Sequence, residues 1–190
     1  MVEAPVIAFR DAVEFEAWLE AHVDLQAGVW LKIAKKGSGL PSLTSDEAVD
    51  VGLCFGWISG QRRSLDEHHY LQKYVPRRAG SRWSQVNVDK VAVLTAAGRM
   101  RPAGQAEVDA ARADGRWDAA YAPQRHAVMP PDLAAALAGH APAARAFEAL
   151  GRTQQYALIL KLLTARGEAA RQRQLAKVMA TLDPSPHRAG

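Results

Sequence analysis

The chain has 190 residues, which fits one domain or two small ones and is long enough to bury a hydrophobic core. Hydrophobic residues make up 48% and charged residues 23%, a balance that excludes a disordered chain, and no apolar run approaches the ~20 residues that span a bilayer. The formal net charge of +4 favours anionic partners only in a general way, because the arginines are interspersed with Asp and Glu.

The N-terminus and the single cysteine indicate a cytoplasmic protein. The first twenty residues, "MVEAPVIAFRDAVEFEAWLE", turn acidic where a secretory signal would still be apolar. Cys54 has no second cysteine with which to form an internal disulfide, and this fits a reducing compartment. We therefore predict a cytoplasmic location without membrane insertion.

The first elements along the chain are a helix and a strand. Asp11 followed by Glu14 predicts a capping box that opens a helix over residues 12–22. Residues 28–37, "GVWLKIAKKG", alternate Val29, Leu31 and Ile33 with less apolar residues between two glycines, a pattern typical of a half-buried strand.

A second helix and a hairpin follow. Thr44 and Glu47 form a second predicted capping box, and the helix that they open is expected to stop near Gly56. The segments "ISGQRRSL" and "YLQKYVPR" flank the polar "DEHH", so we predict a β-hairpin that ends at Pro76.

Strand patterns disappear from Ser84 onward, and helix signals take their place. Asn87 is the expected N-cap of the first of these helices, and Thr153 could cap a later one. The predicted helices cover residues 88–97, 102–114, 131–138, 142–150, 154–166 and 168–182. The last presents Leu175, Val178, Met179 and Leu182 at helical spacing. Residues 118–131 are the best linker candidate, and residues 183–190 are expected to fray.

These elements predict an α+β fold. A small mixed sheet with two helices occupies the N-terminal half, residues 1–83, and an all-helical C-terminal half, residues 84–190, packs on it. We predict that both halves unfold as one cooperative unit.

Several familiar chemistries have no support in the sequence. His68 and His69 are adjacent rather than at metal-ligand spacing, and Cys54 lies in apolar "GLCFGW", where a buried thiol is the ordinary interpretation. The loop "KKGSGLPS" lacks the residue order of a phosphate-binding P-loop, so a turn between strand and helix is favoured. We predict no metal and no cofactor.

The segment over residues 53–84 concentrates aromatic and cationic side chains and is the candidate site. Strand alternation places Ser59, Gln61 and Arg63 on one side of the hairpin, and a helix start beside guanidinium groups is an anion site. We predict a cleft that holds an anionic small molecule or an acidic protein segment, with ligand-binding candidates Trp57, Gln61, Arg63, Arg77, Ser81, Trp83 and Asn87.

Three alternatives stay open. In the first, the aromatic residues of this segment only plug the seam between the sheet and the following helices. In the second, the protein binds nucleic acid, as its pI of about 9.4 and the basic "ARGEAARQRQLAKVM" would allow. In the third, it is an enzyme with Asp66, His68 or His69 as a base, although polar residues are common at hairpin turns without any function.

The sequence also resembles a bacterial family. The blocks "GVWLKIAKKGSGLPSLTSDEAVDVGLCFGWISGQ", "YLQKYVPRRAGSRWSQVN", "AAGRMRPAGQAEVDAARADGRWDAAY", "MPPDLAAAL" and "ARGEAARQRQL" together resemble the YdeI/OmpD-associated family, named for bacteriocin protection. Two departures are visible. Ser59 stands where members often carry an acid in a W-I-D-G segment, and "ARGEAARQRQ" replaces a block that commonly reads A-K-R-P-E-T-R-x-R-R.

The resemblance implies a cytoplasmic bacterial protein with an α/β front half and a helical back half. It further implies an association with resistance to cationic antimicrobial peptides or with envelope stress, and it implies no known reaction and no catalytic residue. We therefore expect a non-enzymatic protein of stress or antimicrobial-peptide protection.

Overall fold

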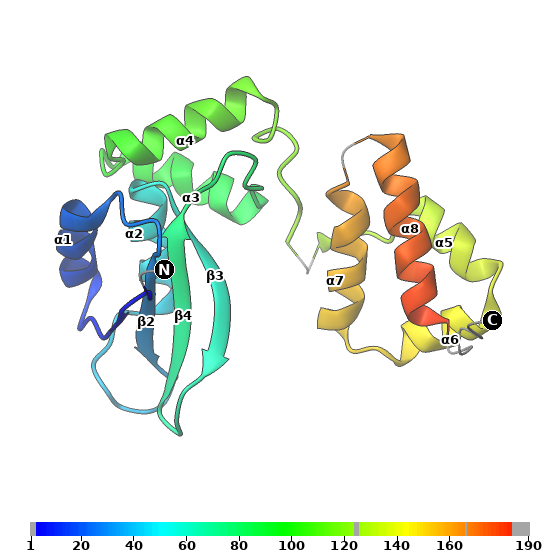
Figure 1. The fold of residues 1–190 in the computed structure, drawn as a ribbon, viewed down its shortest axis with the longest axis horizontal. Helices are drawn as coiled ribbons and strands as arrows, with labels where there is room; N and C mark the ends of the chain where they lie inside the picture. Colours follow the sequence, from blue (N-terminus) through cyan, green and yellow to red (C-terminus); the bar gives the residue numbers. More distant parts are fainter. Residues whose placement is uncertain (1–2, 124–125, 166, 184–190) are drawn as a thin grey trace. The chain divides into compact units, whose positions relative to one another are not determined.

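The computed structural model describes residues 3–123, 126–165 and 167–183. The chain divides into two compact units, Met1–Ala120 and Tyr121–Gly190, whose elements Figure 1 shows in chain order. The division falls within the predicted linker, residues 118–131. The first unit therefore extends beyond the predicted boundary at residues 83 and 84, because two further helices pack with the sheet.

The first unit is built on a four-stranded mixed sheet in the order β1-β2-β4-β3. β1 (Val6–Ile7) pairs parallel with β2 (Val29–Ala34), while β4 (His69–Pro76) pairs antiparallel with both β2 and β3 (Trp57–Ser64). The mixed sheet and its hairpin confirm the predicted α+β class. β1 escaped prediction because two residues are too short to display a period.

Four helices complete the first unit: α1 (Ala12–His22), α2 (Ser45–Cys54), α3 (Gln85–Ala96) and α4 (Pro102–Ala113). The centre of their core is formed by β2, whose residues Val29, Leu31 and Ile33 are buried as the alternation predicted. The core joins side chains from all four helices to the sheet, namely Phe15, Leu19, Ala48, Val51, Leu53, Trp57, Tyr74, Trp83, Val91, Leu94, Val108 and Ala111.

Capping explains where these helices begin. The Thr44–Glu47 capping box is present as predicted. Asp11 accepts the N–H of Glu14, but the Glu14 carboxylate accepts the N–H of Arg10 instead of that of Asp11, so the first predicted box is only half formed. The N-cap of α3 is Ser84, whose hydroxyl accepts the N–H of Asn87. The prediction of Asn87 as the N-cap was wrong, because the N-cap already lies three residues earlier, where the Ser84 hydroxyl accepts the backbone N–H of Asn87.

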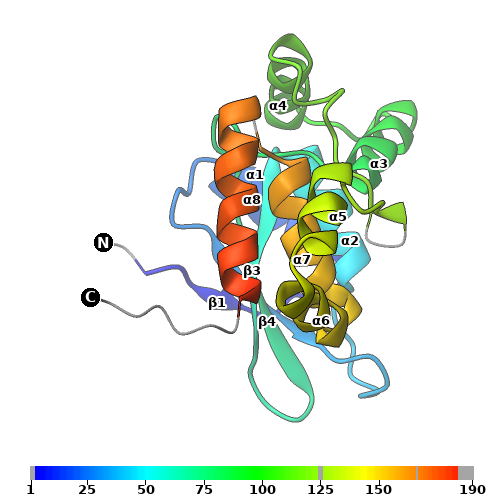
Figure 2. The ribbon, with the colours of Figure 1, turned by 90° about the vertical axis from the view of Figure 1, so that its right-hand side faces the viewer.

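The second unit consists of four helices, which Figure 2 views from the side of α8. They are α5 (Pro131–Ala138), α6 (Ala141–Ala149), α7 (Arg152–Leu163) and α8 (Glu168–Leu182). Gly151, not Thr153, occupies the N-cap of α7. The helices share a core of their own, to which α8 contributes Val178 and Leu182 with Leu175 and Met179 beside them, as the spacing predicted. Of the predicted frayed tail, residues 184–190 lie outside the described residues.

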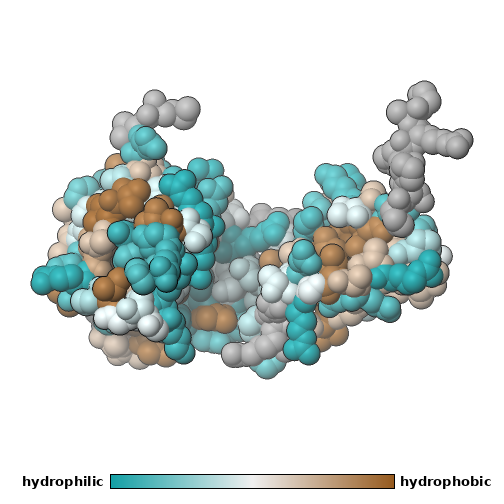
Figure 3. Space-filling model, turned by 90° about the horizontal axis from the view of Figure 1, so that it is seen from below, coloured by the Kyte–Doolittle hydropathy of each residue, from teal (hydrophilic) through white to brown (hydrophobic). Residues whose placement is uncertain are grey.

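The surface of both units mixes hydrophilic side chains with small hydrophobic patches, as the view in Figure 3 shows. Exposed apolar residues include Val13 and Val93 in the first unit and Val128 and Leu163 in the second. Within the described ranges, every helix is too short or too polar to traverse a lipid bilayer.

Candidate functional site

A β-bulge in β3 determines which arginine lies on which face of the sheet. Ser59 pairs with Tyr74, but the next paired residue, Arg62, is opposite Gln72, so β3 holds one residue more than β4 over this stretch. An extra residue reverses the alternation of side chains beyond it. Arg62 therefore shares the helix-covered face with Ser59, and Arg63 lies on the opposite face. The prediction that Ser59 and Arg63 share a side was wrong for this reason.

Arg62 is held rigidly at the edge of the helix-covered face. Its Nε donates to Oε1 of Gln72 at 2.8 Å, and its Nη2 donates to Oγ of Ser45 at 3.1 Å. The guanidinium also stacks on Tyr70, with Cζ 4.4 Å from the ring centroid. Gln72 is buried and donates its amide N–H to the carbonyl oxygen of Gly60 at 2.9 Å. The bulge and the arginine are thus fixed by the same glutamine.

An open groove of about 700 Å³ lies beside Arg62, and we call it the basic groove. It is bounded by the end of β2, the loop over residues 35–44, the start of α2 and the hairpin. Its polar lining consists of Lys35, Lys36, Ser38, Ser42, Thr44, Ser45, Asp46, Arg62 and Tyr70.

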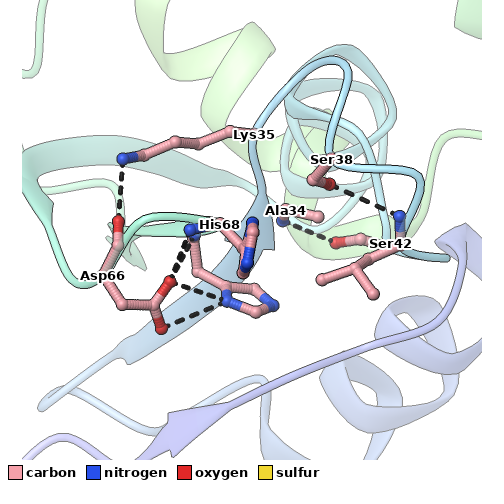
Figure 4. Close-up of polar contacts among 8 residues, drawn as sticks. Ala34, Lys35, Ser38, Ser42, Asp66 and His68 are labelled. Carbon is pink, nitrogen blue, oxygen red and sulfur yellow. Dashed lines mark hydrogen bonds and ion pairs between the residues drawn. The ribbon is translucent and has the colours of Figure 1, made fainter.

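Side-chain hydrogen bonds tie the loop of the basic groove to the strands (Figure 4). Ser42 Oγ accepts the N–H of Ala34 at 3.1 Å and donates to the carbonyl oxygen of Leu43. Lys35 Nζ donates to the carbonyl oxygen of Asp66 in the hairpin turn at 2.8 Å. These bonds hold the Ser42 hydroxyl and the Lys35 ammonium group in place at the groove.

The electrostatic character of the groove is cationic. Lys35, Lys36 and Arg62 line it together with a single carboxylate, Asp46. That carboxylate is itself paired with Nζ of Lys90 at 2.9 Å. The N-terminus of α2 adds a partial positive charge at the same edge. Such an arrangement favours a negatively charged ligand.

The hairpin turn next to the groove has an organised carboxylate. Desolvation tends to raise the pKa of Asp66, but hydrogen bonds from the His69 ring and from the N–H groups of His68 and His69 outweigh it and lower the pKa to about 2. The ring nitrogen Nδ1 of His69 lies 3.0 Å from Oδ1 of Asp66. Asp66 therefore orders the turn while its backbone carbonyl holds Lys35.

Two of the seven predicted site residues, Trp57 and Asn87, lie beside a small cavity of about 20 Å³ in the first unit. Tyr74 and Ser59 also line it. Trp57 is 1% exposed, and neither its Nε1 nor the Tyr74 hydroxyl has a hydrogen-bond partner in the described part of the chain. Burial raises the pKa of Tyr74 far above its usual range. The cavity has the size of one water molecule rather than of a metabolite.

Arg77, Ser81 and Trp83 form a second cluster, in which Arg77 and Trp83 are buried and Ser81 is half-buried. The Arg77 guanidinium stacks on Trp83 and donates through Nη1 to the carbonyl oxygen of Arg82 at 3.1 Å. The carbonyl oxygen of Ser81 accepts from Nη1 of Arg116 at 2.8 Å. The contacts of this cluster are those of a packed seam between the sheet and the following helices.

The last two candidates, Gln61 and Arg63, lie elsewhere again. Gln61 belongs to the bulge, and its carbonyl oxygen accepts from Nε2 of Gln72 at 3.1 Å. Arg63 stacks on Trp30, with Cζ 4.4 Å from the ring centroid. The seven candidates therefore fall into three separate places, and none of them lines the basic groove.

Sequence reasoning missed Lys35, Lys36 and Arg62 as possible ligand contacts. The segment "KKGSGLPS" carries a signal in its paired lysines and its two serines, although it lacks the residue order of a P-loop. The bulge that directs Arg62 into the groove leaves no such signal in the strand pattern. In the described ranges, His, Cys, Asp and Glu form no group of three or more that could hold a metal ion.

The fold and the site define a two-unit α+β protein whose first unit carries a basic groove. Residues 7–107 match the family model described as a domain of unknown function, DUF8412, and because this match covers more than half of the chain, the protein belongs to that family. Residues 126–183, which contain the helices of the second unit, match the model described as bacteriocin-protection, YdeI or OmpD-associated. The predicted resemblance is thus confirmed. Searches of the curated proteins and of the solved structures find no significant match.

Proposed function

We propose that this protein is a non-enzymatic protection protein that binds an anionic small molecule or an acidic protein segment in the basic groove. One observation carries the proposal: three cationic side chains and five hydroxyl-bearing residues line one open groove beside a single carboxylate. Carboxylate and phosphate oxygens are the ligand groups that accept hydrogen bonds from such a lining.

The individual cations suit different parts of such a ligand. Arg62 is held by Gln72 and Ser45, so a ligand that approaches it meets a preorganised guanidinium. Lys36 is exposed and lies two residues after the end of β2, and its flexible side chain can adjust to the position of a charge. A fixed Arg62 guanidinium beside an adjustable Lys36 ammonium group suits a ligand that has more than one anionic oxygen.

The family of the C-terminal segment supports the biological role in this proposal. Its description as bacteriocin-protection points to a function in bacterial stress or in protection against antimicrobial peptides. We propose that the protein acts in the cytoplasm, because its single cysteine cannot form an internal disulfide and fits a reducing compartment.

A non-enzymatic role is preferred because the polar groups of the hairpin turn already have structural tasks. The Asp66 carboxylate accepts two backbone N–H groups as well as the His69 ring. This is the usual arrangement of an Asx-type turn. The enzymatic alternative would need turnover that is lost in a His68→Ala or His69→Ala variant.

A thermal-shift screen tests the proposed ligand class. The full chain is incubated with nucleotides, phosphorylated metabolites, polycarboxylates and acidic peptides, and the expected result is stabilisation by at least one of them. The same compound should give no shift with a Lys35→Ala, Lys36→Ala double variant.

The matched control removes two lysines from the second unit, Lys161→Ala and Lys177→Ala. Both lysines are exposed and neither belongs to the groove lining. Because this variant also loses two lysines, it has the same net charge as the groove variant. Equal loss of the shift in both variants would reveal general charge attraction. If no compound stabilises the wild type more than the groove variant, the proposal is wrong.

A further inference from the structure

The face of the sheet opposite the buried residues of β2 is a second cationic surface, which we call the outer sheet face. Because Val29, Leu31 and Ile33 are buried in the core, Trp30 and Lys32 point to the other side. The strand register places Lys73 opposite Trp30, and Arg63 and Lys32 both opposite Leu71. The bulge is the reason that Arg63 lies on this side.

An aromatic ring and two cations are stacked at the centre of the outer sheet face. The Arg63 guanidinium lies 4.4 Å from the centroid of the Trp30 ring, and Nζ of Lys73 lies 5.4 Å from the same centroid. Leu71 is only 2% exposed, although it belongs to the same face. The long side chains therefore cover the apolar strand surface and present planar and charged groups outward.

The charge of the sheet is one-sided. The four strands carry Lys32, Arg62, Arg63 and Lys73, and they contain neither Asp nor Glu. On the outer sheet face, none of the three cations forms an ion pair within the described residues. Cross-strand pairs of opposite charge stabilise a sheet, and the three cations of this face have no such partner among the described residues. Their positive charge can therefore attract a polyanion.

We infer that the outer sheet face binds single-stranded nucleic acid. Unstacked bases would stack on the Trp30 and Arg63 pair, while Lys32 and Lys73 contact the phosphates. Sheets that read single strands combine these two elements, aromatic or guanidinium planes for the bases and neighbouring cations for the backbone. An acidic peptide would satisfy the charges but not the stacking groups, and a duplex keeps its bases inside the stack. This inference does not rest on the proposed function, since it concerns another surface and another ligand.

Fluorescence anisotropy tests the inference with the full chain. The probes are labelled mixed-sequence RNA and DNA single strands of about 20 nucleotides, together with the corresponding duplex, at about 50 mM salt. We expect the single strands to bind more tightly than the duplex, and an Arg63→Ala, Lys73→Ala double variant to weaken binding about tenfold or more. The slope of log K against log salt should become shallower by about 1 to 2 in this variant.

Two controls separate this surface from the basic groove. The Lys35→Ala, Lys36→Ala variant removes the same charge from the groove and should change the affinity by less than about twofold. Trp30→Leu, which keeps an apolar side chain over Leu71, should weaken binding without loss of the folded state, as circular dichroism can verify. The inference is overturned if no single strand binds at low salt, or if the duplex binds equally well. It is also overturned if the groove variant loses as much affinity as the Arg63 and Lys73 variant. The same holds if an unlabelled acidic peptide displaces the labelled strand as effectively as an unlabelled strand does.

Discussion

The guanidinium of Arg77 lies over the indole of Trp83, with Cζ 3.7 Å from the ring centroid. Trp83 also contacts Trp117, whose ring centroid lies 4.9 Å away. Both Arg77 and Trp83 are buried, and Trp83 belongs to the core that α3 and α4 share with the sheet. The pair therefore fastens the chain that leaves β4 onto the helices that follow.

Trp83→Ala should lower the free energy of unfolding of the first unit by about 3–5 kcal/mol, because the indole is almost completely buried. All five tryptophans lie at or before residue 117. Denaturation followed by tryptophan fluorescence therefore reports on the first unit, and far-ultraviolet circular dichroism reports on both. A variant that unfolds at the same denaturant concentration as wild type would contradict the buried position of Trp83.

The same two signals test the predicted cooperativity of the chain. If the sheet and all the helices unfold as one unit, fluorescence and circular dichroism will give coincident midpoints in wild type and in Trp83→Ala. Leu133→Ala is a useful partner variant, since Leu133 is fully buried in the core of the second unit. A Leu133→Ala variant whose fluorescence midpoint is unchanged would show that the two units unfold separately.

Gly104→Ala should destabilise the protein although alanine is the better helix former. In the helix interior alanine gains about 1 kcal/mol over glycine. Here, however, an added Cβ would lie 2.1 Å from the carbonyl oxygen of Cys54, where α4 crosses the end of α2. The backbone must then move, so we expect a net loss of about 1–3 kcal/mol, measured by chemical denaturation. In Gly139→Ala the nearest contact is an ordinary 3.7 Å, and this control should be close to neutral.

The turn at Asp66 should make stability depend on pH in the acid range. Its pKa in the folded protein is about 2, below the usual value of 3.8, so folding favours the ionised carboxylate. The stabilisation is fully present above the unfolded pKa of about 4 and is lost as the pH falls toward 2. The difference in unfolding midpoint between wild type and Asp66→Asn should therefore be constant near neutral pH and shrink below about pH 4. A difference that does not change with pH would show that the carboxylate contributes through its shape alone.

The sequence predicted those parts of the fold that repeat a period or carry a cap. β2 alternates over six residues, and α2 begins with a complete capping box, so both were found. The β3–β4 hairpin was found because a polar turn separates two apolar runs. The boundary between the units was harder to predict from the sequence, because it depends on which elements α3 and α4 pack against. The apolar face of an amphipathic helix does not specify the element that covers it.

The basic groove was not predicted from the sequence, and one extra residue in β3 explains why Arg62 was missed. The bulge at Gly60 and Gln61 shifts every later side chain of β3 to the other face. Strand alternation without the bulge assigned Arg63 to the row that Arg62 in fact occupies. A buried polar side chain, Gln72, stabilises the bulge from the neighbouring strand. A contact between two strands, such as that of Gln72 with the bulge, cannot be predicted from the alternation pattern of one strand.

The C-terminal family block contains an arginine whose role the structure explains. Arg171 in α8 donates from Nε and Nη2 to the two carboxylate oxygens of Asp132 in α5, at 2.6 and 2.8 Å. Its Nη1 also lies 3.3 Å from the carbonyl oxygen of Leu162 in α7. The hydrogen bonds from Arg171 are the main cause that lowers the pKa of Asp132. One guanidinium thus links three of the four helices of the second unit.

Arg171→Lys should therefore destabilise the second unit even though the charge is kept, because an ammonium group cannot make the bidentate contact and reach Leu162 at the same time. The pair is about one-third exposed, so solvent screening limits the expected loss to about 1 kcal/mol. Arg173→Lys is the matched control two residues further along α8, since Arg173 is exposed. Thermal unfolding followed by circular dichroism should show a lower midpoint for Arg171→Lys and an unchanged one for Arg173→Lys. Equal midpoints for the two variants would mean that the three-helix contact of Arg171 contributes nothing measurable to stability.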